Sequence, residues 1–339
     1  MRAPQKACFT NHLYIRLWLA SWLSQKGSIH GFCLSCCFWK IHILFPNFGF
    51  LSKLSSRQQG FLLMVVATFC FPTMDVMAKY LLQSQPVMQV VWARYTGQFI
   101  LILCLFAPRL NKVVRTQFPR LQLARSATLF GGTCFFFLSL RYLDQGQTSA
   151  IFMVAPLLIT ALAVLFLAEK IGIRRGVSVI GGFVGAIVII QPHSDIFTPA
   201  SFLPLAAASF YASYSVLTRK LGDAESPHTT LFFTAGFGAV CTSILLPLIW
   251  VAPAQATDII LMASMSLFGG LGHYAVILSL RRVEASETAP LNYLAVVFAM
   301  FWGFMVFAEI PSMATLGGAA IIIGSGLYLW RREKIVKKA

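Results

Sequence analysis

The sequence contains few charged residues for its length. Asp, Glu, Lys and Arg together make up 11% of the 339 residues, whereas a soluble domain carries about 25%. Acidic residues are the scarcest, with 11 Asp and Glu against 27 Lys and Arg, so the formal net charge is +16. The first 59 residues contain no Asp or Glu. This composition excludes an ordinary soluble domain, and the positive charge has to be explained by where it lies in the chain.

Motifs of familiar enzymes and pumps are also missing. The chain has no H-E-x-x-H metalloprotease motif, no G-x-S-x-G nucleophile elbow and no Walker A phosphate-binding loop. The last absence argues against an ATP-driven pump. We therefore predict that the protein is not an enzyme.

The eight cysteines are scattered and favour neither a disulfide framework nor a metal site. Four of them lie in apolar segments, where a lone thiol behaves as a small apolar residue. The spacing Cys33-x2-Cys36-Cys37 has no second pair of cysteines that would complete a zinc site. We expect neither a metal nor a cofactor.

Long hydrophobic segments fill most of the chain. Hydrophobic residues make up 58% of it, and the mean hydropathy is +0.74. They come in blocks of about 20 residues, the length that crosses the hydrocarbon core of a bilayer. We therefore predict an all-α integral membrane protein. Its ten transmembrane helices are expected at 60–82, 86–106, 122–141, 147–168, 174–190, 201–219, 228–250, 259–280, 287–308 and 314–330.

Basic residues alternate between successive predicted loops. Loops on one side of the membrane carry clusters of Lys and Arg, whereas those at 83–85, 191–200, 251–258 and 309–313 contain none. Arg141 is the only basic residue on that second side outside the spans. By the positive-inside rule both termini lie in the cytoplasm. We expect a multi-pass protein of the bacterial inner (cytoplasmic) membrane, with its positive charge in short loops and no nucleic-acid partner.

One stretch of the sequence occurs twice, at an offset of 140 residues. Residues 138–169 begin with Leu-Ser-Leu-Arg and end with Ala-Glu, and residues 278–309 do the same. A period of this length is too long for a solenoid unit. It predicts two homologous halves of five helices each.

The predicted organisation has four parts. Residues 1–59 form a basic N-terminal extension, poorly ordered or at the membrane surface, which the fold does not need. Residues 60–190 and 191–331 form the two repeats, and residues 332–339 form a basic cytoplasmic tail. Because five spans return the chain to the opposite face, the second repeat is inserted upside down relative to the first. Inverted repeats are typical of secondary transporters, whose halves expose a central site to either side in turn.

The two halves resemble the drug/metabolite transporter superfamily, EamA type. The resemblance covers about residues 60–331. It rests on the five-helix halves, on the endings Ala168-Glu169 and Ala308-Glu309 of the fourth helices, and on glycine-rich fifth helices. The glycines are Gly176, Gly181, Gly182, Gly185, Gly317, Gly318, Gly324 and Gly326. The resemblance implies gradient-driven alternating access around a central cavity, with a small-molecule cargo. Members carry amino acids, vitamins, S-adenosylmethionine or nucleotide sugars, so the cargo and the direction of transport stay open.

Charged side chains inside the spans are the first candidates for a functional site, because they are costly to bury in a bilayer. Asp75 and Lys79 lie one turn apart on one face of the first helix, in the acid-then-base order that helices favour. Arg94 on the second helix lies at a similar depth, roughly 10 Å below the outer surface. We expect Asp75 to pair with Lys79 or Arg94 and to face the cavity. Such pairs either bind cargo or only brace the outer gate.

Two of these charges occur in one half only, whereas Lys79 corresponds to Arg219 at the cytoplasmic end of the sixth helix. At the repeat offset, Asp75 and Arg94 correspond to Ser215 and Thr234, which are neutral. A charge present in one half favours a role in cargo binding or in coupling. Asp75 is our candidate for the group that carries a coupling proton, and the cations favour a cargo with a carboxylate or phosphate.

Polar and aromatic residues within the spans complete the candidate site. They are Trp92, Tyr95, Gln98, Tyr211, Tyr214, His273, Tyr274, Asn292, Tyr293 and Trp302. Aromatic rings could stack on a planar cargo, although aromatics make up 14% of the chain and most must pack or face lipid. His273 could hold cargo or a proton, or could join two helices by a hydrogen bond. We rank a vitamin such as riboflavin, an amino acid or S-adenosylmethionine above a hydrophobic drug.

Other features favour a structural role. The Gly181-x3-Gly185 spacing permits close helix approach. We assign it to packing within the chain, with a homodimer contact as the minor alternative. Glu169 and Glu309 end their helices and are expected to anchor at the membrane surface. The rival classes to a transporter are a membrane-embedded enzyme and a non-transporting sensor or scaffold.

Overall fold

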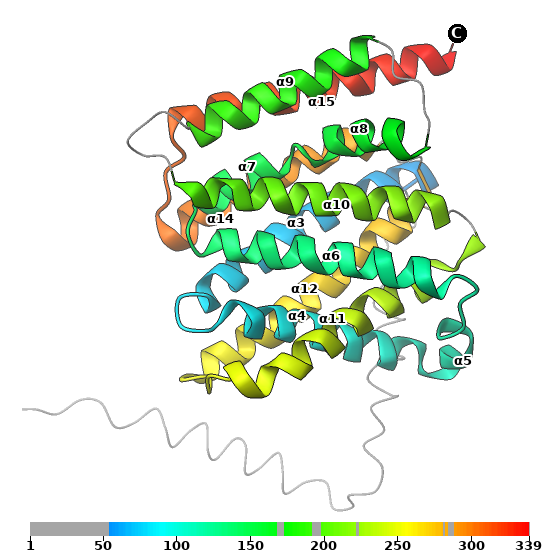
Figure 1. Ribbon diagram of the computed structural model, residues 1–339, viewed down its shortest axis with the longest axis vertical. Coiled ribbons are helices and arrows are strands. Elements are labelled where there is room, and N and C mark those ends of the chain that lie inside the picture. The colour runs from blue at the N-terminus through cyan, green and yellow to red at the C-terminus, as the bar shows by residue number, and fades with distance from the viewer. Residues whose placement is uncertain are drawn as a thin grey trace, which may run out of the picture. The chain divides into compact units, whose positions relative to one another are not determined.

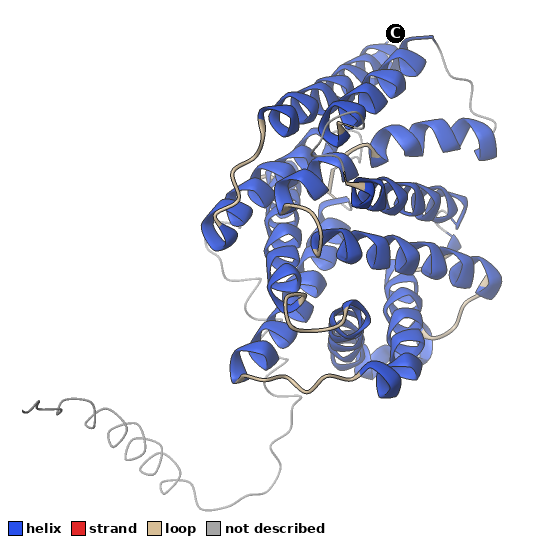
Figure 2. Cartoon of the chain, turned by 60° about the vertical axis from the view of Figure 1, so that its left-hand side comes forward, coloured by secondary structure: helices blue, strands red, loops and turns tan. Residues whose placement is uncertain are grey.

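The computed structural model describes residues 54–167, 173–191, 198–221, 224–280, 282–283 and 288–338. Within these ranges the regular elements are all helices, and there is no strand (Figure 1, Figure 2). Six of the described helices are long and apolar enough to cross a membrane, and four shorter apolar helices accompany them. The prediction of an all-α membrane protein is confirmed. Most of the N-terminal extension lies outside the described residues.

The first repeat supplies five membrane segments in the described part of the chain. They are α3 (Ser56–Leu81), α4 (Val87–Phe106), α6 (Pro119–Leu140), the pair α7 (Gln145–Phe152) and α8 (Ala155–Leu167), and α9 (Ile173–Ile190). The short helices η2 (Ala107–Arg109) and α5 (Leu110–Val113) lie between α4 and α6. α3 begins before the predicted Gly60 because Ser55 and Gln58 form a capping box there.

The second repeat follows the same order. Its segments are η3 (Pro199–Ser201) with α10 (Phe202–Leu221), α11 (Pro227–Ile249), α12 (Ala256–Leu280), η5 (Ala289–Tyr293) with α14 (Leu294–Phe307), and α15 (Met313–Lys338). α15 extends beyond its predicted end at 330, so the basic tail begins as a continuation of this helix.

The fourth span of each repeat departs from the continuous helices that the sequence predicted at 147–168 and 287–308. The break falls at 153–154 in the first repeat, between α7 and α8. In the second repeat the change from η5 to α14 falls at 293–294. These positions are equivalent at the offset of 140 residues. The fourth span is thus broken in the first repeat, whereas in the second repeat it changes from 3-10 to α geometry without a gap.

Proline explains the break in the first repeat, because the residue four positions before Pro156 is Phe152, the last residue of α7. Pro156 is the second residue of α8, and Pro290 is the second residue of η5. A proline has no N–H to donate, and its ring collides with the carbonyl four residues earlier, so a regular α-helix tends to end before it. At membrane depth an interrupted helix leaves backbone polar groups that need protein or water partners.

Helices pack across the two repeats in a reciprocal pattern. α3 packs most against α12 and α6 most against α10, so the first helix of each repeat meets the third of the other. α4 packs against α11, α7 against α14, and α9 against α15, so the second, fourth and fifth segments meet their own counterparts. Figure 1 shows α9 and α15 side by side at one edge of the molecule. Such reciprocity is what a two-fold axis produces, and with inverted repeats that axis lies in the membrane plane.

Glycines permit the close approach of α9 and α15. A Cβ added to Gly185 would lie 2.8 Å from the carbonyl oxygen of Gly318, and a Cβ on Gly318 would meet the carbonyl oxygen of Gly185. Gly181 faces Ser325 of α15 in the same way. The predicted glycine motif is thus used for packing within the chain.

Large apolar side chains cover the outer surface of the bundle. Ile180 on α9 is 65% exposed, Leu248 on α11 is 84% exposed, and Ile260 on α12 is 62% exposed. Exposed apolar surface of this kind would be a liability in water. It is the expected lipid-facing surface of a membrane protein.

Candidate functional site

Lys79 joins the two repeats at the end of α3. Its Nζ forms an ion pair with the Glu309 carboxylate and donates a hydrogen bond of 2.7 Å to the Leu143 carbonyl. The ammonium also lies 5.2 Å from the ring centroid of Phe307. The predicted pair of Lys79 with Asp75 is wrong. An i,i+4 pair contributes only about 0.2–0.5 kcal/mol, and a carboxylate and a carbonyl from other elements replace it.

Glu309 is positioned by a turn at the end of α14. Ala308 adopts a left-handed conformation with φ 55°, and Glu309 N donates to the Gly303 carbonyl at 3.1 Å. The carboxylate then accepts a hydrogen bond of 2.9 Å from Gln145 N, at the positive end of the α7 dipole. The Glu309 side chain is only 13% exposed, because it is held inside the protein by the ion pair and this hydrogen bond. Glu169, its repeat mate, lies outside the described residues.

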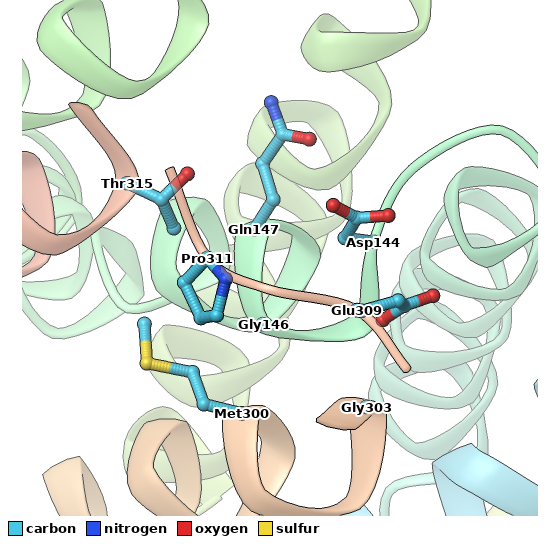
Figure 3. Close-up of a pocket in the computed structure, with 8 residues that line it drawn as sticks. All are labelled: Asp144, Gly146, Gln147, Met300, Gly303, Glu309, Pro311 and Thr315. Atoms are coloured by element: carbon cyan, nitrogen blue, oxygen red, sulfur yellow. The ribbon is translucent and has the colours of Figure 1, made fainter. Parts of the chain in front are cut away.

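A small pocket lies beside this pair, between α7, α14 and the start of α15 (Figure 3). Its lining comes from both repeats: Asp144, Gly146, Gln147, Met300, Gly303, Glu309, Pro311 and Thr315. Asp75, Arg94 and the predicted tyrosines do not line it. The pocket belongs to the end of the bundle where the chain turns from α6 to α7.

Arg94 and Tyr95 turn toward α6. Arg94 Nη1 donates to the Thr133 hydroxyl at 3.3 Å, and the Tyr95 hydroxyl hydrogen-bonds to the same oxygen at 2.9 Å. The guanidinium also lies 5.4 Å from the ring centroid of Phe137. Arg94 Nε has no hydrogen-bond partner among the described residues. Neutral groups on α6 thus satisfy this buried cation in part.

Asp75 is buried in α3, with 7% of its surface exposed. It makes no hydrogen bond or ion pair with any residue that the structure describes. The predicted ion pair with Arg94 is therefore not formed, because the guanidinium is directed toward Thr133 and Phe137 of α6 and toward the ring of Tyr95.

Arg125 is a second buried arginine, which the sequence-based candidates omitted. Its Nε donates to Thr218 at 2.7 Å, and its Nη1 donates to the Thr234 hydroxyl at 2.8 Å and to the Thr230 carbonyl at 3.3 Å. Its Nη2 donates to the Tyr214 hydroxyl at 2.6 Å. The guanidinium lies 4.4 Å from the centroid of that ring. The signal that could have found it is a basic residue within the predicted span 122–141.

A row of aromatic rings connects this arginine to the break in the fourth span. The ring centroids of Tyr214 and Tyr211 are 5.7 Å apart, and those of Tyr211 and Phe152 are 5.5 Å apart. Phe152 is the last residue of α7 and also contacts Phe136 at 5.1 Å. The candidates Tyr211 and Tyr214 are thus brought next to Arg125.

Three of the predicted aromatic residues make packing contacts. Trp92 donates to Ser243 at 3.0 Å and so joins α4 to α11. Trp302 donates to Thr73 at 2.9 Å and joins α14 to α3. Tyr293 is buried against Gly326 of α15. These contacts place the three side chains in the framework between helices.

The remaining predicted residues lie inside the bundle or on its half-buried faces. His273 on α12 contacts the ring of Phe71 at 5.0 Å, and the charges of Arg94 and Arg125 both act on it. Gln98 is buried, and Tyr274 and Asn292 are half-buried. The structure thus gathers Arg94, Arg125 and His273 around one interior region.

Comparisons with known proteins match nearly all of the described chain. A family model described as the EamA-like transporter family matches residues 58–191 and 198–330. The S-adenosylmethionine uptake transporter of Rickettsia felis is 28% identical over 260 residues, covering 77% of this chain and 88% of that protein. The riboflavin transporter of Brucella anthropi is 30% identical over 252 residues, covering 70% of this chain and 86% of that protein.

A solved crystal structure shows the same fold. It matches with a TM-score of 0.59 at 18% identity, and the match covers 81% of this chain and 99% of that one. At this identity the similarity concerns the fold alone.

Proposed function

Because the chain belongs to the EamA-like transporter family, we propose that it moves a small polar metabolite across the cytoplasmic membrane by alternating access. The protein is a multi-pass membrane transporter with a small-molecule cargo. The observation that carries the proposed mechanism is the reciprocal packing of the two repeats. A pseudo-two-fold arrangement of inverted halves lets them exchange roles as the site opens to one side and then to the other.

The Lys79–Glu309 ion pair supports this mechanism, because it can close the path to the cargo site from one side of the membrane. It ties α3 of the first repeat to the α14–α15 connection of the second. With both termini in the cytoplasm, as the basic loops favour, this pair lies on the outer side. The outer path then opens when the pair separates.

The cargo site lies in the interior of the bundle in this proposal. Asp75, Arg94, Tyr95 and His273 supply its charged and polar groups, with Tyr211 and Tyr214 as stacking surfaces. The relatives named above carry S-adenosylmethionine and riboflavin, both of which contain a planar ring system. A ring of that kind suits the aromatic row that ends at Tyr214.

Asp75 is the proposed carrier of a coupling proton. Inside a bilayer an unpaired carboxylate is costly, and intramembrane acids of this kind form proton relays in transporters. The absence of an ion pair or hydrogen bond to any described residue supports this role, because Arg94, the cation that acts on Asp75, is not in contact with it.

The cargo leaves chemically unchanged in this proposal, so the protein is not an enzyme. A second copy of the chain is not required, since the glycine face of α9 is already covered by α15. A homodimer would need another surface.

The test is uptake into proteoliposomes that contain the purified protein. Labelled S-adenosylmethionine and riboflavin are offered with and without an imposed pH gradient, and mass spectrometry identifies what has entered. We expect gradient-dependent entry of an unmodified compound. Chemical conversion without translocation would favour the membrane-embedded enzyme, and binding without translocation would favour the sensor.

A further inference from the structure

Arg125 is a buried cation without an acidic partner. It lies within α6 and is 3% exposed. Its hydrogen bonds all go to neutral groups: Thr218, Thr230, Thr234 and Tyr214. No carboxylate among the described residues lies within ion-pair distance of it. An arginine buried within a membrane span without a counter-charge is costly, and such residues mark functional sites.

The interior of the described spans carries an excess of positive charge. Lys79 is neutralised by Glu309 at the end of α3. Outside the basic part of α15 after Tyr328, the charged residues more than one helical turn from any end of the described spans are Arg94, Arg125 and Asp75. Two cations and one acid leave a positive interior, which an anionic group on the cargo would neutralise.

The groups around Arg125 leave two donors without an acceptor. The hydroxyls of Thr218 and Thr234 donate to carbonyls of their own helices, so they can only accept from the guanidinium. Tyr214 also accepts, from Nη2, and its own O–H has no acceptor among the described residues. A guanidinium has five N–H donors, of which four are used here. One N–H on Nη2 and the Tyr214 O–H therefore remain next to each other.

Two adjacent donors on a positive centre are suited to a carboxylate or phosphate oxygen. The guanidinium is held in place from three helices, α6, α10 and α11, so its position is fixed before an anion arrives. The aromatic row through Tyr214 and Tyr211 begins at the same point. A ring stacked on that row would place an attached anionic group beside Arg125.

We infer that Arg125, with the Tyr214 hydroxyl, binds an anionic group of the cargo, so that the cargo is a ring compound bearing a carboxylate or a phosphate. This inference rests on the proposed function, because it identifies the class of molecule that the transporter carries. It selects among candidate cargoes: S-adenosylmethionine has a carboxylate, and riboflavin has no anionic group.

The test compares matched pairs of ring compounds. The first pair is S-adenosylmethionine and its decarboxylated form, and the second is riboflavin 5′-phosphate and riboflavin. Binding to the purified full-length protein is measured by calorimetry, and transport is measured separately in proteoliposomes. A charge-assisted hydrogen bond predicts that the anionic member of at least one pair binds about tenfold more tightly or better. A preference within the S-adenosylmethionine pair identifies the bound group as a carboxylate, and a preference within the riboflavin pair identifies it as a phosphate.

Variants assign the preference to Arg125. Arg125→Gln should bind both members of that pair equally, whereas Tyr214→Phe should lose only part of the preference. Arg125→Lys keeps the positive charge and loses the planar set of guanidinium donors, so it should retain a weakened preference for the anionic member. This variant replaces Arg125→Gln in the test if Arg125→Gln does not fold. Ser243→Ala, which removes the partner of Trp92 elsewhere on α11, is the matched control and should keep the full preference.

The failures of the two proposals are distinguishable. Equal affinity within both pairs, no binding of any member, or a preference that survives in both arginine variants would overturn the role of Arg125. In the first and third cases transport could still occur, and the proposed function would stand. Binding with the expected preference but without translocation would overturn the proposed function and leave the anion site in place.

Discussion

Replacing Glu309 by Gln should open the outer side of the protein. The substitution removes the charge that holds Lys79, while the amide oxygen can still accept from Gln145 N. Both members of the pair are 13% exposed, so water and salt screen the interaction less than at an open surface. A hydrogen bond to a charged group contributes about 1.5–3 kcal/mol. If that amount is lost from the closed state alone, the closed population falls about ten- to hundredfold relative to the open one.

The assay is the reaction rate of a single cysteine in the pocket beside the pair. Gln147 lines that pocket and is a suitable position, in a chain whose eight native cysteines are replaced by Ser. In intact cells a membrane-impermeant maleimide should label Gln147→Cys about ten- to hundredfold faster when Glu309→Gln is added. Lys79→Met should have a similar effect, because it removes the other partner.

A matched control is Glu225→Gln. Glu225 also accepts two hydrogen bonds, from the Thr116 hydroxyl at 2.6 Å and from Gln117 N at 2.7 Å, but it lies in the connection between α10 and α11. Its loss should leave the labelling rate at Gln147→Cys unchanged. An equally unchanged rate in Glu309→Gln and Lys79→Met would refute the assignment of the pair as an outer closure.

Exchanging the charges should restore only part of the closure. The double variant Lys79→Glu with Glu309→Lys keeps the attraction between the two positions. It also sets a carboxylate against the Leu143 carbonyl and an ammonium against Gln145 N, which are the present partners of the opposite charges. The labelling rate should therefore lie between those of the wild type and of the single variants. Full restoration would mean that the two backbone contacts contribute little.

Further predictions concern packing, coupling and backbone strain. Gly185→Ala places a Cβ 2.8 Å from a carbonyl oxygen of α15 and should destabilise the protein by about 1–3 kcal/mol. Gly317→Ala, which meets nothing within 4 Å and lies within a helix, should not lower the melting temperature in detergent. Asp75→Asn should abolish the pH-gradient dependence of uptake, whereas the control Asp144→Asn, at an exposed position, should keep it. If the gradient dependence is unchanged in Asp75→Asn, Asp75 has a structural role only. Ala308 has a φ of 55°, a conformation that costs Ala about 1–2 kcal/mol and that Gly adopts without this cost. The melting temperature of Ala308→Gly should therefore not fall. A clear decrease would show that Ala308 is not strained.

The arrangement of helices was predictable because it depends on local composition and on repetition. Apolar blocks of bilayer length and the duplicated stretch at 138–169 and 278–309 are properties of the sequence alone. The departures of the fourth spans from a continuous helix were less accessible. Pro156 and Pro290 are visible in the sequence, but α3 contains Pro72 and continues through it as a helix. Whether a proline ends a helix depends on which neighbouring groups satisfy the freed carbonyl.

The partners of the charged residues were not predictable from spacing along one helix. Lys79 has Asp75 one turn away, yet its partner Glu309 is 230 residues distant in the sequence. Arg94 likewise lies against Thr133 on another helix. Arg125 was missed because it lies near the inner end of its predicted span, where basic residues commonly mark the membrane surface. Its burial by α10 and α11 becomes visible only after the repeats are packed together.

The most direct test of the account is counterflow in proteoliposomes. Vesicles are loaded with unlabelled S-adenosylmethionine or riboflavin, and a trace of the labelled compound is added outside. Counterflow needs neither the coupling ion nor the direction of net transport to be known. We predict that the label accumulates transiently above the level in protein-free vesicles, and that Arg125→Gln lowers this accumulation for the anionic cargo. A label that never exceeds the protein-free level for either compound or for the anionic and neutral analogues would contradict alternating access to a small-molecule site.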